Sequence, residues 1–583
     1  MRVYNSLHSN IENRSGISFT VFVSKFDLAY VEEADILKSL CDREEKSASK
    51  FFLSVFVLTA STVIVKIIGM LYKIPMLNIL GAEGMGYFNS AYEIYALLCV
   101  VVTTGLPIAL SILISANRDS QNAFGVKRIY RSSLFIFLII GIIGSCGLFF
   151  SARWISKFIE NENIYFCILT IAPAFFCVCI SSAIRGYFQG FSRMMPTAVS
   201  QLLEAVFKLV LGLLFALYAI DKGLGVPLIA AYAAMGFAVG MLLSTLYLLI
   251  TKRISDKRNI FAKATNQNKI LKNNVKTNGM LLKIAVPITV SAIIINLTKI
   301  IDMTFIMRRL QDLGYTSGVA NEIFGMYSTV VIPIFSLVPS LLSPISLALI
   351  PELSSAIETE DYSLQAYIAR TSVRFTAFFA IPATFAIMLY SKPIISILFS
   401  SAADKYEYIV PLLTFLASSV LFSCMITTTN AILQSYRNTV KPIISMSIGV
   451  LVKIVSEYIL IGIPNINIYG APISTFLCDI VIMVINLYFI SGQLKGRFYE
   501  GAVFLKTMLA SVVAMSVSFA VYLPLSIKTS NIKLAFIIAL PVTVIVYFII
   551  SFLIKSISVE DVTMLPLGNK IKKYFVKEIK KEN

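Results

Sequence analysis

Residues 227–250 read PLIAAYAAMGFAVGMLLSTLYLLI and carry no charged side chain. An α-helix rises about 1.5 Å per residue, so this segment forms about 36 Å of apolar helix, enough to cross a hydrocarbon core about 30 Å thick. Apolar runs of comparable length recur from Phe51 to Ile554. The sequence therefore predicts an all-α polytopic membrane protein.

The composition excludes several classes of protein. Of the 583 residues, 57% are hydrophobic and only 14% are charged, whereas a soluble domain carries about 25% charged residues. The 50 Lys and Arg residues lie mostly in loops and tails beside apolar runs, which indicates contact with membrane lipids rather than nucleic-acid binding. The single histidine, His8, precedes every apolar run, so no imidazole acts as a base or metal ligand within the membrane. We therefore expect no catalytic residue and no metal site.

Apolar windows of about 20 residues predict fourteen spans. They lie approximately at 50–72, 88–115, 130–151, 164–187, 197–220, 227–250, 281–306, 323–350, 371–391, 408–433, 442–463, 470–491, 502–525 and 532–554. Loops and loop edges after even-numbered spans carry 22 Lys and Arg residues, and those after odd-numbered spans carry 10. Because basic residues concentrate on the cytoplasmic side, both termini are expected in the cytoplasm, with the chain in the cell membrane.

The chain repeats itself at an offset of 245 positions. Arg185–Pro196 reads RGYFQGFSRMMP, Asn430–Pro442 reads NAILQSYRNTVKP, and the same offset relates Lys208 to Lys453. Because the offset covers six predicted spans, an even number, both copies enter the membrane from the same side, and their pseudo-twofold axis lies along the membrane normal. We expect two six-helix lobes with a substrate cavity between them, followed by two further helices.

These patterns divide the chain into six parts. The expected parts are a disordered tail at 1–49, an N-lobe at 50–251, a basic cytoplasmic connector at 252–279, a C-lobe at 280–492, two spans at 493–555 and a basic cytoplasmic tail at 556–583. Apolar and basic residues are interleaved in the last part, which predicts a helix lying on anionic lipid.

Three motifs near the first predicted spans carry a family resemblance. Lys66–Pro75 reads KIIGMLYKIP, Leu80–Tyr87 reads LGAEGMGY, and Gly105–Pro107 reads GLP. They resemble the stage V sporulation protein B family, which belongs to the multidrug, oligosaccharidyl-lipid and polysaccharide exporter superfamily together with MurJ-type lipid II flippases. The resemblance covers roughly residues 50–555.

The resemblance implies a transporter rather than an enzyme. Its substrate would be an undecaprenyl-linked sugar precursor, moved from the cytoplasmic to the outer leaflet by alternating access, in cell-wall, spore-cortex or polysaccharide synthesis. We expect a monomer whose partners are the lipid-linked oligosaccharide and membrane lipids. The alternatives are a drug/cation antiporter of the same superfamily, a membrane scaffold for envelope synthesis or a membrane glycosyltransferase. The short, acid-poor outer loops disfavour the glycosyltransferase.

Charged residues within the spans are costly and are therefore candidate substrate contacts. Lys66 and Lys73 share one face of the first span, where ammonium groups would neutralise a diphosphate. The resemblance implies a basic residue at Lys66, although the further cavity arginines of MurJ-type proteins have no match here. Snorkelling to the interface is the alternative, and Lys73, near the span end, suits it better. Glu93 on the second span is expected to act as a gate or as a partner of Lys66.

The two lysines related by the repeat each have a glutamate one helical turn away. Glu204 and Lys208 are spaced i,i+4 on the fifth span, and Lys453 and Glu457 are spaced i,i+4 on the eleventh. One interpretation is that each helix neutralises its own charge. The other is that both lysines line the cavity between the lobes and bind the substrate with the acids tuning them.

A third group of charges suggests ion coupling by Na⁺ or H⁺. Lys299 and Asp302 are spaced i,i+3 on the seventh span, and Asp479 lies near Thr475 on the twelfth. MurJ-type exporters resemble this chain in having a cation site among spans seven, eleven and twelve, and hard oxygen ligands suit such ions. Lys299 alternatively neutralises Asp302, and Lys453 occupies the span where a ligand is expected.

Overall fold

The computed structural model describes residues 61, 64–119, 123–191, 193–258, 274–436, 440–494, 501–554 and 556. Within these ranges every regular element is a helix, as predicted. Residues 64–100 form the first described helical run. The elements that follow are η1 (Val101–Gly105), α3 (Leu106–Asp119), α4 (Ala123–Phe158), α5 (Ile164–Gly190), α6 (Met195–Asp221), α7 (Val226–Arg258), α8 (Asn274–Asp312), α9 (Ser317–Met326), η3 (Tyr327–Val331), α10 (Ile332–Glu358), α11 (Tyr362–Leu398), η4 (Ser400–Lys405), α12 (Tyr406–Ala417), α13 (Val420–Ser435), α14 (Val440–Ile461), η5 (Asn467–Tyr469), α15 (Gly470–Gln493), α16 (Gly501–Thr529) and α17 (Ile532–Leu553).

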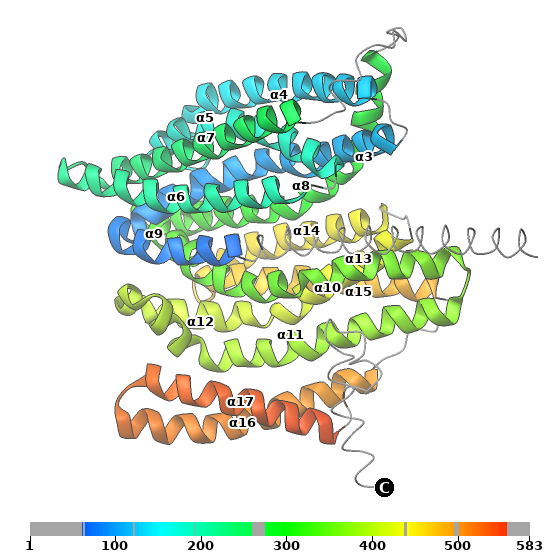
Figure 1. Ribbon diagram of the computed structural model, residues 1–583. Coiled ribbons are helices and arrows are strands. Elements are labelled where there is room, and N and C mark those ends of the chain that lie inside the picture. Colours follow the sequence, from blue (N-terminus) through cyan, green and yellow to red (C-terminus); the bar gives the residue numbers. More distant parts are fainter. Residues whose placement is uncertain are drawn as a thin grey trace, which may run out of the picture.

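Thirteen helical runs within the described ranges are long and apolar enough to cross a membrane, one fewer than the fourteen predicted spans. The difference lies in the first run, Ile64–Ser115, which would be about 78 Å long if it were straight. Gly81 has a φ of 68°, a left-handed conformation that glycine adopts at little cost, and the run turns back on itself there (Figure 1). The first run therefore supplies two of the expected spans.

The helices gather into two lobes and a peripheral pair (Figure 1). Helices α3 to α7 pack together in one lobe, whereas α10 to α15 form the other, and α16 and α17 pack against each other and against α11. The repeat is visible in the packing, because α6 lies on α7 as α14 lies on α15. Helix α8 contacts α14 in the second lobe and η1 and α3 in the first, so it connects the two.

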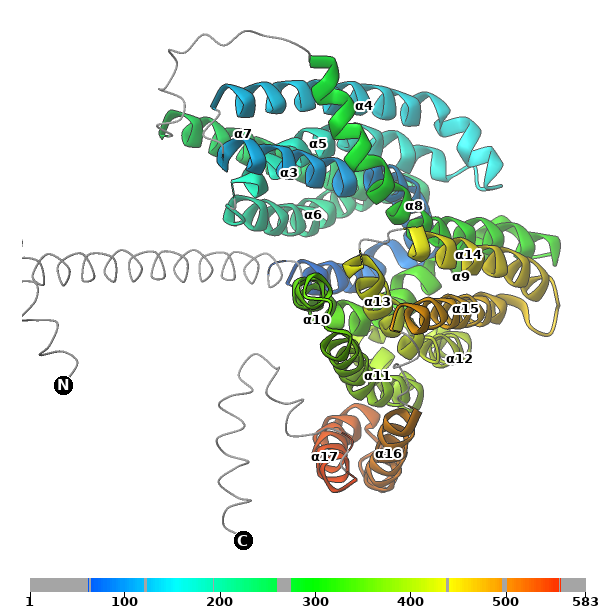
Figure 2. The same ribbon diagram turned by 90° about the vertical axis from the view of Figure 1, so that its right-hand side faces the viewer.

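The first described helix lies on the boundary between the lobes. Figures 1 and 2 both place residues 64–80 between α6 of the first lobe and α10 of the second. On one side the Lys208 ammonium of α6 lies over the ring of Tyr72, and on the other the Lys66 ammonium donates to Ser340 of α10. Charged side chains of this helix are therefore presented where the substrate cavity was predicted.

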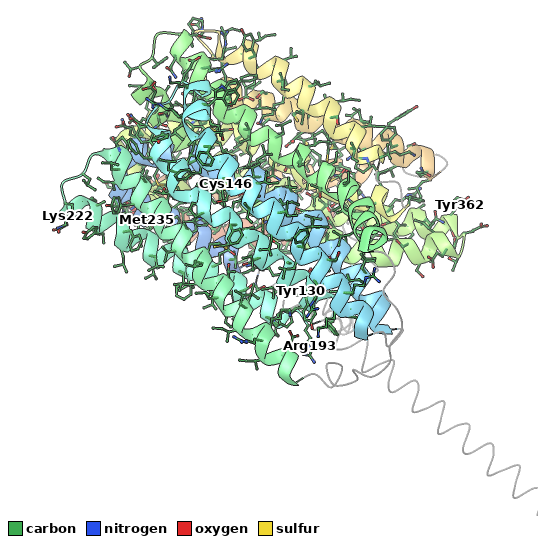
Figure 3. The ribbon with its side chains drawn as sticks, turned by 90° about the horizontal axis from the view of Figure 1, so that it is seen from above. Tyr130, Cys146, Arg193, Lys222, Met235 and Tyr362 are labelled. Carbon is green, nitrogen blue, oxygen red and sulfur yellow. The ribbon has the colours of Figure 1, made fainter. Side chains whose placement is uncertain are left out.

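The ends of the helices alternate as the distribution of basic residues requires. Tyr130 and Arg193 lie close together at one end of the first lobe, and Lys222 lies at the other end (Figure 3). Near Tyr130, the Lys252 ammonium lies 4.2 Å from the ring centroid and forms an ion pair of 2.7 Å with Asp256. The predicted tails at 1–49 and 556–583 and most of the connector at 252–279 lie outside the described residues.

Candidate functional site

Four lysines from three helical segments meet at the boundary between the lobes. Lys66 and Lys73 come from the helix of residues 64–80, Lys208 from α6 and Lys299 from α8. Lys299 acts electrostatically on Lys66, and both Lys208 and Lys299 act on Lys73. We call these four residues the lysine cluster.

Lys73 is held by an irregular segment of the second lobe. Its ammonium donates to the backbone carbonyl of Ser328 at 2.7 Å. Ser328 lies in the π-helical turn Tyr327–Val331, where the widened hydrogen-bond pattern leaves main-chain groups available to a side chain. Asn89 donates to the hydroxyls of Ser328 and Thr329 at 2.9 and 2.7 Å, so both arms of the first helical run contact this turn. Lys73 is thus part of the lobe boundary and does not extend freely to the membrane surface.

Lys208 is surrounded by aromatic rings. Its ammonium lies 4.2 Å from the ring centroid of Tyr92, 4.8 Å from that of Phe237 and 5.5 Å from that of Tyr72. Aromatic faces attract a cation without neutralising its charge. The rings therefore supply no counter-ion to this ammonium group.

The acid that contacts the lysine cluster is Glu93. Its carboxylate lies 3.8 Å from the ammonium of Lys299, and it also acts on Lys73 and Lys208. The predicted pairing of Glu93 with Lys66 is not seen, because Lys66 donates to the Ser340 hydroxyl at 2.7 Å instead. The predicted pairing of Lys299 with Asp302 is also replaced, since Lys299 contacts Glu93. The cluster consequently has more positive than negative charge.

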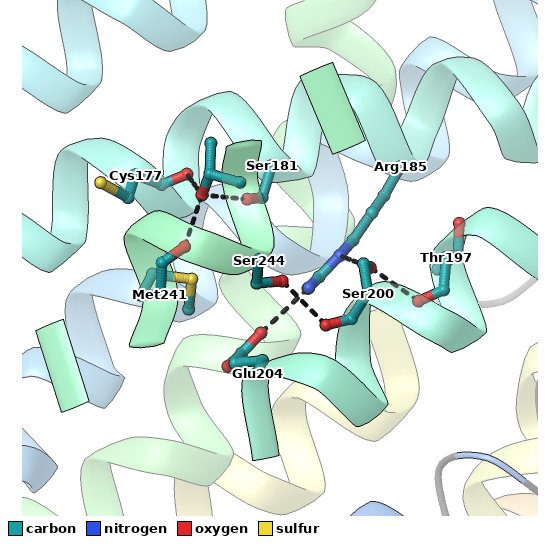
Figure 4. Close-up of polar contacts among 9 residues, drawn as sticks. Cys177, Ser181, Arg185, Thr197, Ser200, Glu204, Met241 and Ser244 are labelled. Atoms are coloured by element: carbon teal, nitrogen blue, oxygen red, sulfur yellow. Dashed lines mark hydrogen bonds and ion pairs between the residues drawn. The ribbon is translucent and has the colours of Figure 1, made fainter. Parts of the chain in front are cut away.

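Glu204 has a partner that the spacing along the helix did not reveal. The Arg185 guanidinium of α5 forms an ion pair of 2.9 Å with the Glu204 carboxylate and donates to the Ser200 hydroxyl at 3.0 Å (Figure 4). Glu204 also acts electrostatically on Lys208 across the i,i+4 spacing, so its charge is shared between Arg185 and Lys208. Glu204 therefore joins α5 to α6, and the ammonium group of Lys208 lies among aromatic rings within the influence of Glu204.

We expect Arg185→Ala to lower the midpoint of thermal unfolding more than the double change Arg185→Ala with Glu204→Gln. The single change leaves the Glu204 carboxylate at membrane depth without its partner, whereas the double change removes both charges. Scanning unfolding of the detergent-purified protein measures both midpoints. Arg193→Ala, at the exposed end of the lobe, is the matched control and should have little effect. Equal midpoints for the single and double variants would contradict the pairing.

Lys453, the repeat partner of Lys208, has a different environment. Its ammonium lies 2.7 Å from a carboxylate oxygen of Asp302 on α8 and donates to the Thr475 hydroxyl on α15 at 2.7 Å. Lys453 is 2% exposed and Asp302 is 8% exposed. The i,i+4 spacing gave the wrong partner here, because the ion pair forms with Asp302 of another helix. We call Asp302, Lys453, Glu457 and Thr475 the C-lobe network.

Glu457 is fully buried beside this ion pair. Asp302 and Ser474 lie near enough to hydrogen-bond its carboxyl group, and Asp302 and Lys453 also act on it electrostatically. The hydroxyl of Tyr327, in the π-helical turn, is also buried here, lies within hydrogen-bonding reach of Thr475 and is influenced by Asp302 and Glu457. Asp479 forms no ion pair within 4.0 Å with any residue that the structure describes, but Lys453 and Asp302 act on it. The structure thus gathers the predicted ion-coupling acids around Lys453 and places Lys299 in the lysine cluster.

The lobes are joined at the helix ends that the basic residues assign to the outside. Asn161 donates to the side-chain oxygen of Asn321 at 2.9 Å, and Asn321 donates to the backbone carbonyl of Glu83 at 2.6 Å. Both asparagines are almost completely buried, at 1% and 0% exposure. We call Glu83, Gly86, Asn161, Asn321 and Gly325 the outer seam.

Two glycines allow the main chains to approach closely in this seam. A Cβ atom added to Gly325 would overlap the carbonyl oxygen of Ala82 and lie 2.7 Å from the amide nitrogen of Gly86. A Cβ atom added to Gly86 would overlap the carbonyl oxygen of Asn321. Neither position has room for a side chain while the seam is closed.

Comparison with known proteins assigns the chain to a family. The family described as polysaccharide biosynthesis protein matches residues 52–357, more than half of the chain. The chain belongs to this family. The resemblance indicated by the motifs at Lys66–Pro75 and Leu80–Tyr87 is thereby confirmed.

Two curated relatives and one solved structure agree with this membership. The chain is 25% identical to the lipid II flippase MurJ of Bacillus subtilis (strain 168) over 444 residues, covering 74% of this chain and 80% of the relative. It is 24% identical to stage V sporulation protein B of the same organism over 431 residues, covering 73% and 80%. A structure of the lipid II flippase MurJ in an inward closed conformation matches with a TM-score of 0.66 at 16% identity, covering 85% of this chain and 98% of that one. The multi-pass, two-lobed helical fold is therefore that of these membrane proteins.

Several residues of this family member were not found from its sequence. The basic residues of loops and loop edges predicted orientation, but Arg185, counted among them, is the partner of Glu204. The rings around Lys208 come from three separate helices, and no spacing along one helix relates them. The buried hydroxyl of Tyr327 also carried no sequence signal, because aromatic residues are common throughout the spans.

Proposed function

We propose that the protein flips an undecaprenyl-linked sugar precursor across the cytoplasmic membrane by alternating access between its two lobes. Family membership and the two relatives, a lipid II flippase and a sporulation protein, support a lipid-linked substrate for envelope or spore synthesis. The protein acts as a transporter rather than as an enzyme. It works as a monomer with both termini in the cytoplasm and has no nucleic-acid partner.

The observation that carries this proposal is the excess positive charge of the lysine cluster. Among the described residues the lysine cluster forms one ion pair with a carboxylate, that of Glu93, and Glu204, which acts on Lys208, is shared with Arg185. A lysine within the membrane requires an anionic partner or a wet cavity, because its isolated charge is costly there. The diphosphate of a lipid-linked sugar would supply that partner through charge-assisted hydrogen bonds.

The outer seam supplies the other half of the mechanism. It closes the lobe boundary at the outer side through buried asparagines and glycine contacts. The helix of residues 64–80 carries Lys66 and Lys73 and turns at Gly81 directly beside this seam. Binding of a diphosphate to these lysines would therefore act on the same helix whose outer end must move when the seam opens.

Depletion of the protein in a cell without another transporter of the same substrate tests the proposal. The proposal requires an undecaprenyl-linked precursor to accumulate on the cytoplasmic leaflet and predicts that Lys73→Ala and Lys208→Ala each reduce flipping at least about tenfold, the cost of one charge-assisted hydrogen bond. Lys→Arg at each position should retain part of the activity. Lys222→Ala, at the exposed opposite end, is the matched control. Normal distribution of every such precursor after depletion would overturn the proposed function.

The drug/cation antiporter of the same superfamily is the competing function. The lysine cluster argues against it, because a cationic drug would be repelled by the four ammonium groups. Accumulation of a cationic dye in depleted cells, with no change in lipid-linked precursors, would favour the antiporter.

A further inference from the structure

The C-lobe network contains a cation that belongs to the chain itself. Asp302 on α8 and Thr475 on α15 both place an oxygen 2.7 Å from the Lys453 ammonium on α14. Oxygen atoms contributed by two helices thus converge on one positively charged atom carried by a third. Carboxylate and hydroxyl oxygens are also the ligands that bind hard metal cations in proteins.

We propose that Lys453 permanently fills a cation site in the C-lobe, so that this site binds no alkali-metal ion. The proposal refines the ion coupling of the proposed flippase and rests on that function only for its physiological meaning. An ammonium group and a metal ion cannot share the same oxygen ligands, because both are cations and each requires the space between Asp302 and Thr475. Lys453 is 2% exposed, so the ammonium cannot move to the membrane surface without displacing packed helices.

Glu457 indicates what the site becomes when the ammonium is removed. It is 0% exposed, it lies one helical turn from Lys453 and its carboxyl group lies close to that of Asp302. Without Lys453, two carboxylates and the Thr475 hydroxyl would surround a space with no positive charge. This set of oxygen atoms suits Na⁺.

The other lobe supplies a natural comparison. The offset of 245 positions places Lys208 in register with Lys453 and Gly212 in register with Glu457. Lys208 is held by aromatic rings, and the Glu204 carboxylate is bound by Arg185. Removal of the Lys208 ammonium consequently leaves no pair of free carboxylates, and the same substitution there creates no metal site.

Thermal unfolding of the full-length purified protein in NaCl, KCl and choline chloride at equal ionic strength tests the proposal. The wild-type midpoint should be the same in all three salts. Lys453→Ala should unfold at a lower temperature in choline chloride and recover by a few degrees in NaCl, in a saturable manner, because Na⁺ binds the folded state alone. Lys208→Ala is the matched control and should show no response to Na⁺. Lys453→Ala with Asp302→Asn should lose the response that Lys453→Ala gains.

Two outcomes would overturn the proposal, and neither requires transport. A saturable, Na⁺-specific rise in the wild-type midpoint would show that a metal ion binds despite Lys453, provided that Asp302→Asn abolishes it. Equal midpoints of Lys453→Ala in all three salts would show that no cation site remains when the ammonium is removed. If Lys453→Ala cannot be purified, Lys453→Gln takes its place, because the amide fills the same volume without a charge. If the proposed flippase function were wrong, the expected unfolding midpoints would be the same. The two proposals are therefore tested separately.

Discussion

Gly325→Ala is expected to abolish complementation of a cell depleted of this protein, although the substitution adds a single methyl group. The added Cβ would overlap the carbonyl oxygen of Ala82 and approach the amide nitrogen of Gly86 to 2.7 Å. Both atoms belong to the main chain at the turn of the first helical run, so no side chain can rotate away. Overpacking of this kind costs about 1–3 kcal/mol, and here it destabilises the state in which the outer seam is closed.

The seam must close in every transport cycle, so a cost of this size changes the populations of the two states. A shift of about 1.4 kcal/mol changes a two-state equilibrium tenfold. The helix of residues 64–80 would then be held away from η3, and the hydrogen bond from Lys73 to Ser328 would be lost. We therefore expect a protein that is inserted at normal levels but held with its outer side open.

Thiol labelling distinguishes this trapped state from misfolding. Asn161→Cys places a thiol at a position of 1% exposure in the seam, and a membrane-impermeant maleimide should label it slowly in whole cells. The same cysteine combined with Gly325→Ala should be labelled faster, relative to a parent that carries only the native cysteines. Gly147→Ala is the matched control, because a Cβ at Gly147 meets no atom within 4 Å. Complementation by Gly325→Ala at the wild-type level would show that the seam does not close as tightly as these contacts require.

The sequence predicted the class of the fold and the identity of the unusual charges. Apolar runs and the 245-residue offset were sufficient to predict a two-lobed membrane protein, because both depend only on the order of residues in the chain. Lys66, Lys208, Asp302 and Lys453 stood out because charge is rare and costly within spans. The span count differed only at the first run. The chain turns at Gly81 without interrupting the helical pattern, so two predicted spans form one continuous helical run.

The partners of these charges could not be predicted, because they come from other helices. Spacing along one helix favoured Glu204 with Lys208 and Lys453 with Glu457, whereas the ion pairs join Arg185 to Glu204 and Lys453 to Asp302. An i,i+4 pair on a helix is worth only about 0.2–0.5 kcal/mol, so tertiary contacts readily override it. The internal repeat was misleading in the same way. It relates the two lysines in register but not in environment, since one is bound by rings and the other by a carboxylate.

The reassigned pairing of Lys453 predicts opposite outcomes for two double substitutions. Lys453→Met with Asp302→Asn removes both members of the observed ion pair, whereas Lys453→Met with Glu457→Gln removes the pair suggested by helical spacing. Replacing both charges of a buried pair by neutral groups is often close to neutral, but leaving one buried charge alone costs about 3–5 kcal/mol. The first double variant leaves Glu457 without Lys453, but Glu457 forms no ion pair within 4.0 Å with any residue that the structure describes. In sodium-free buffer we therefore expect this variant to unfold at the higher temperature of the two. The second should unfold well below it, because Asp302 is 8% exposed and loses its ammonium partner.

The single variant Lys453→Met sets the scale for both comparisons. It leaves Asp302 and Glu457 together without a positive charge, so it should be the least stable of the three, with reduced abundance in the membrane. Unfolding midpoints of the purified proteins, together with their levels in membranes, give the ranking. If Lys453→Met with Glu457→Gln proved the more stable double variant, Glu457 would be the true partner of Lys453. The contact with Asp302 would then contribute little to stability, because only the removal of Lys453 together with its true partner leaves no unpaired buried charge.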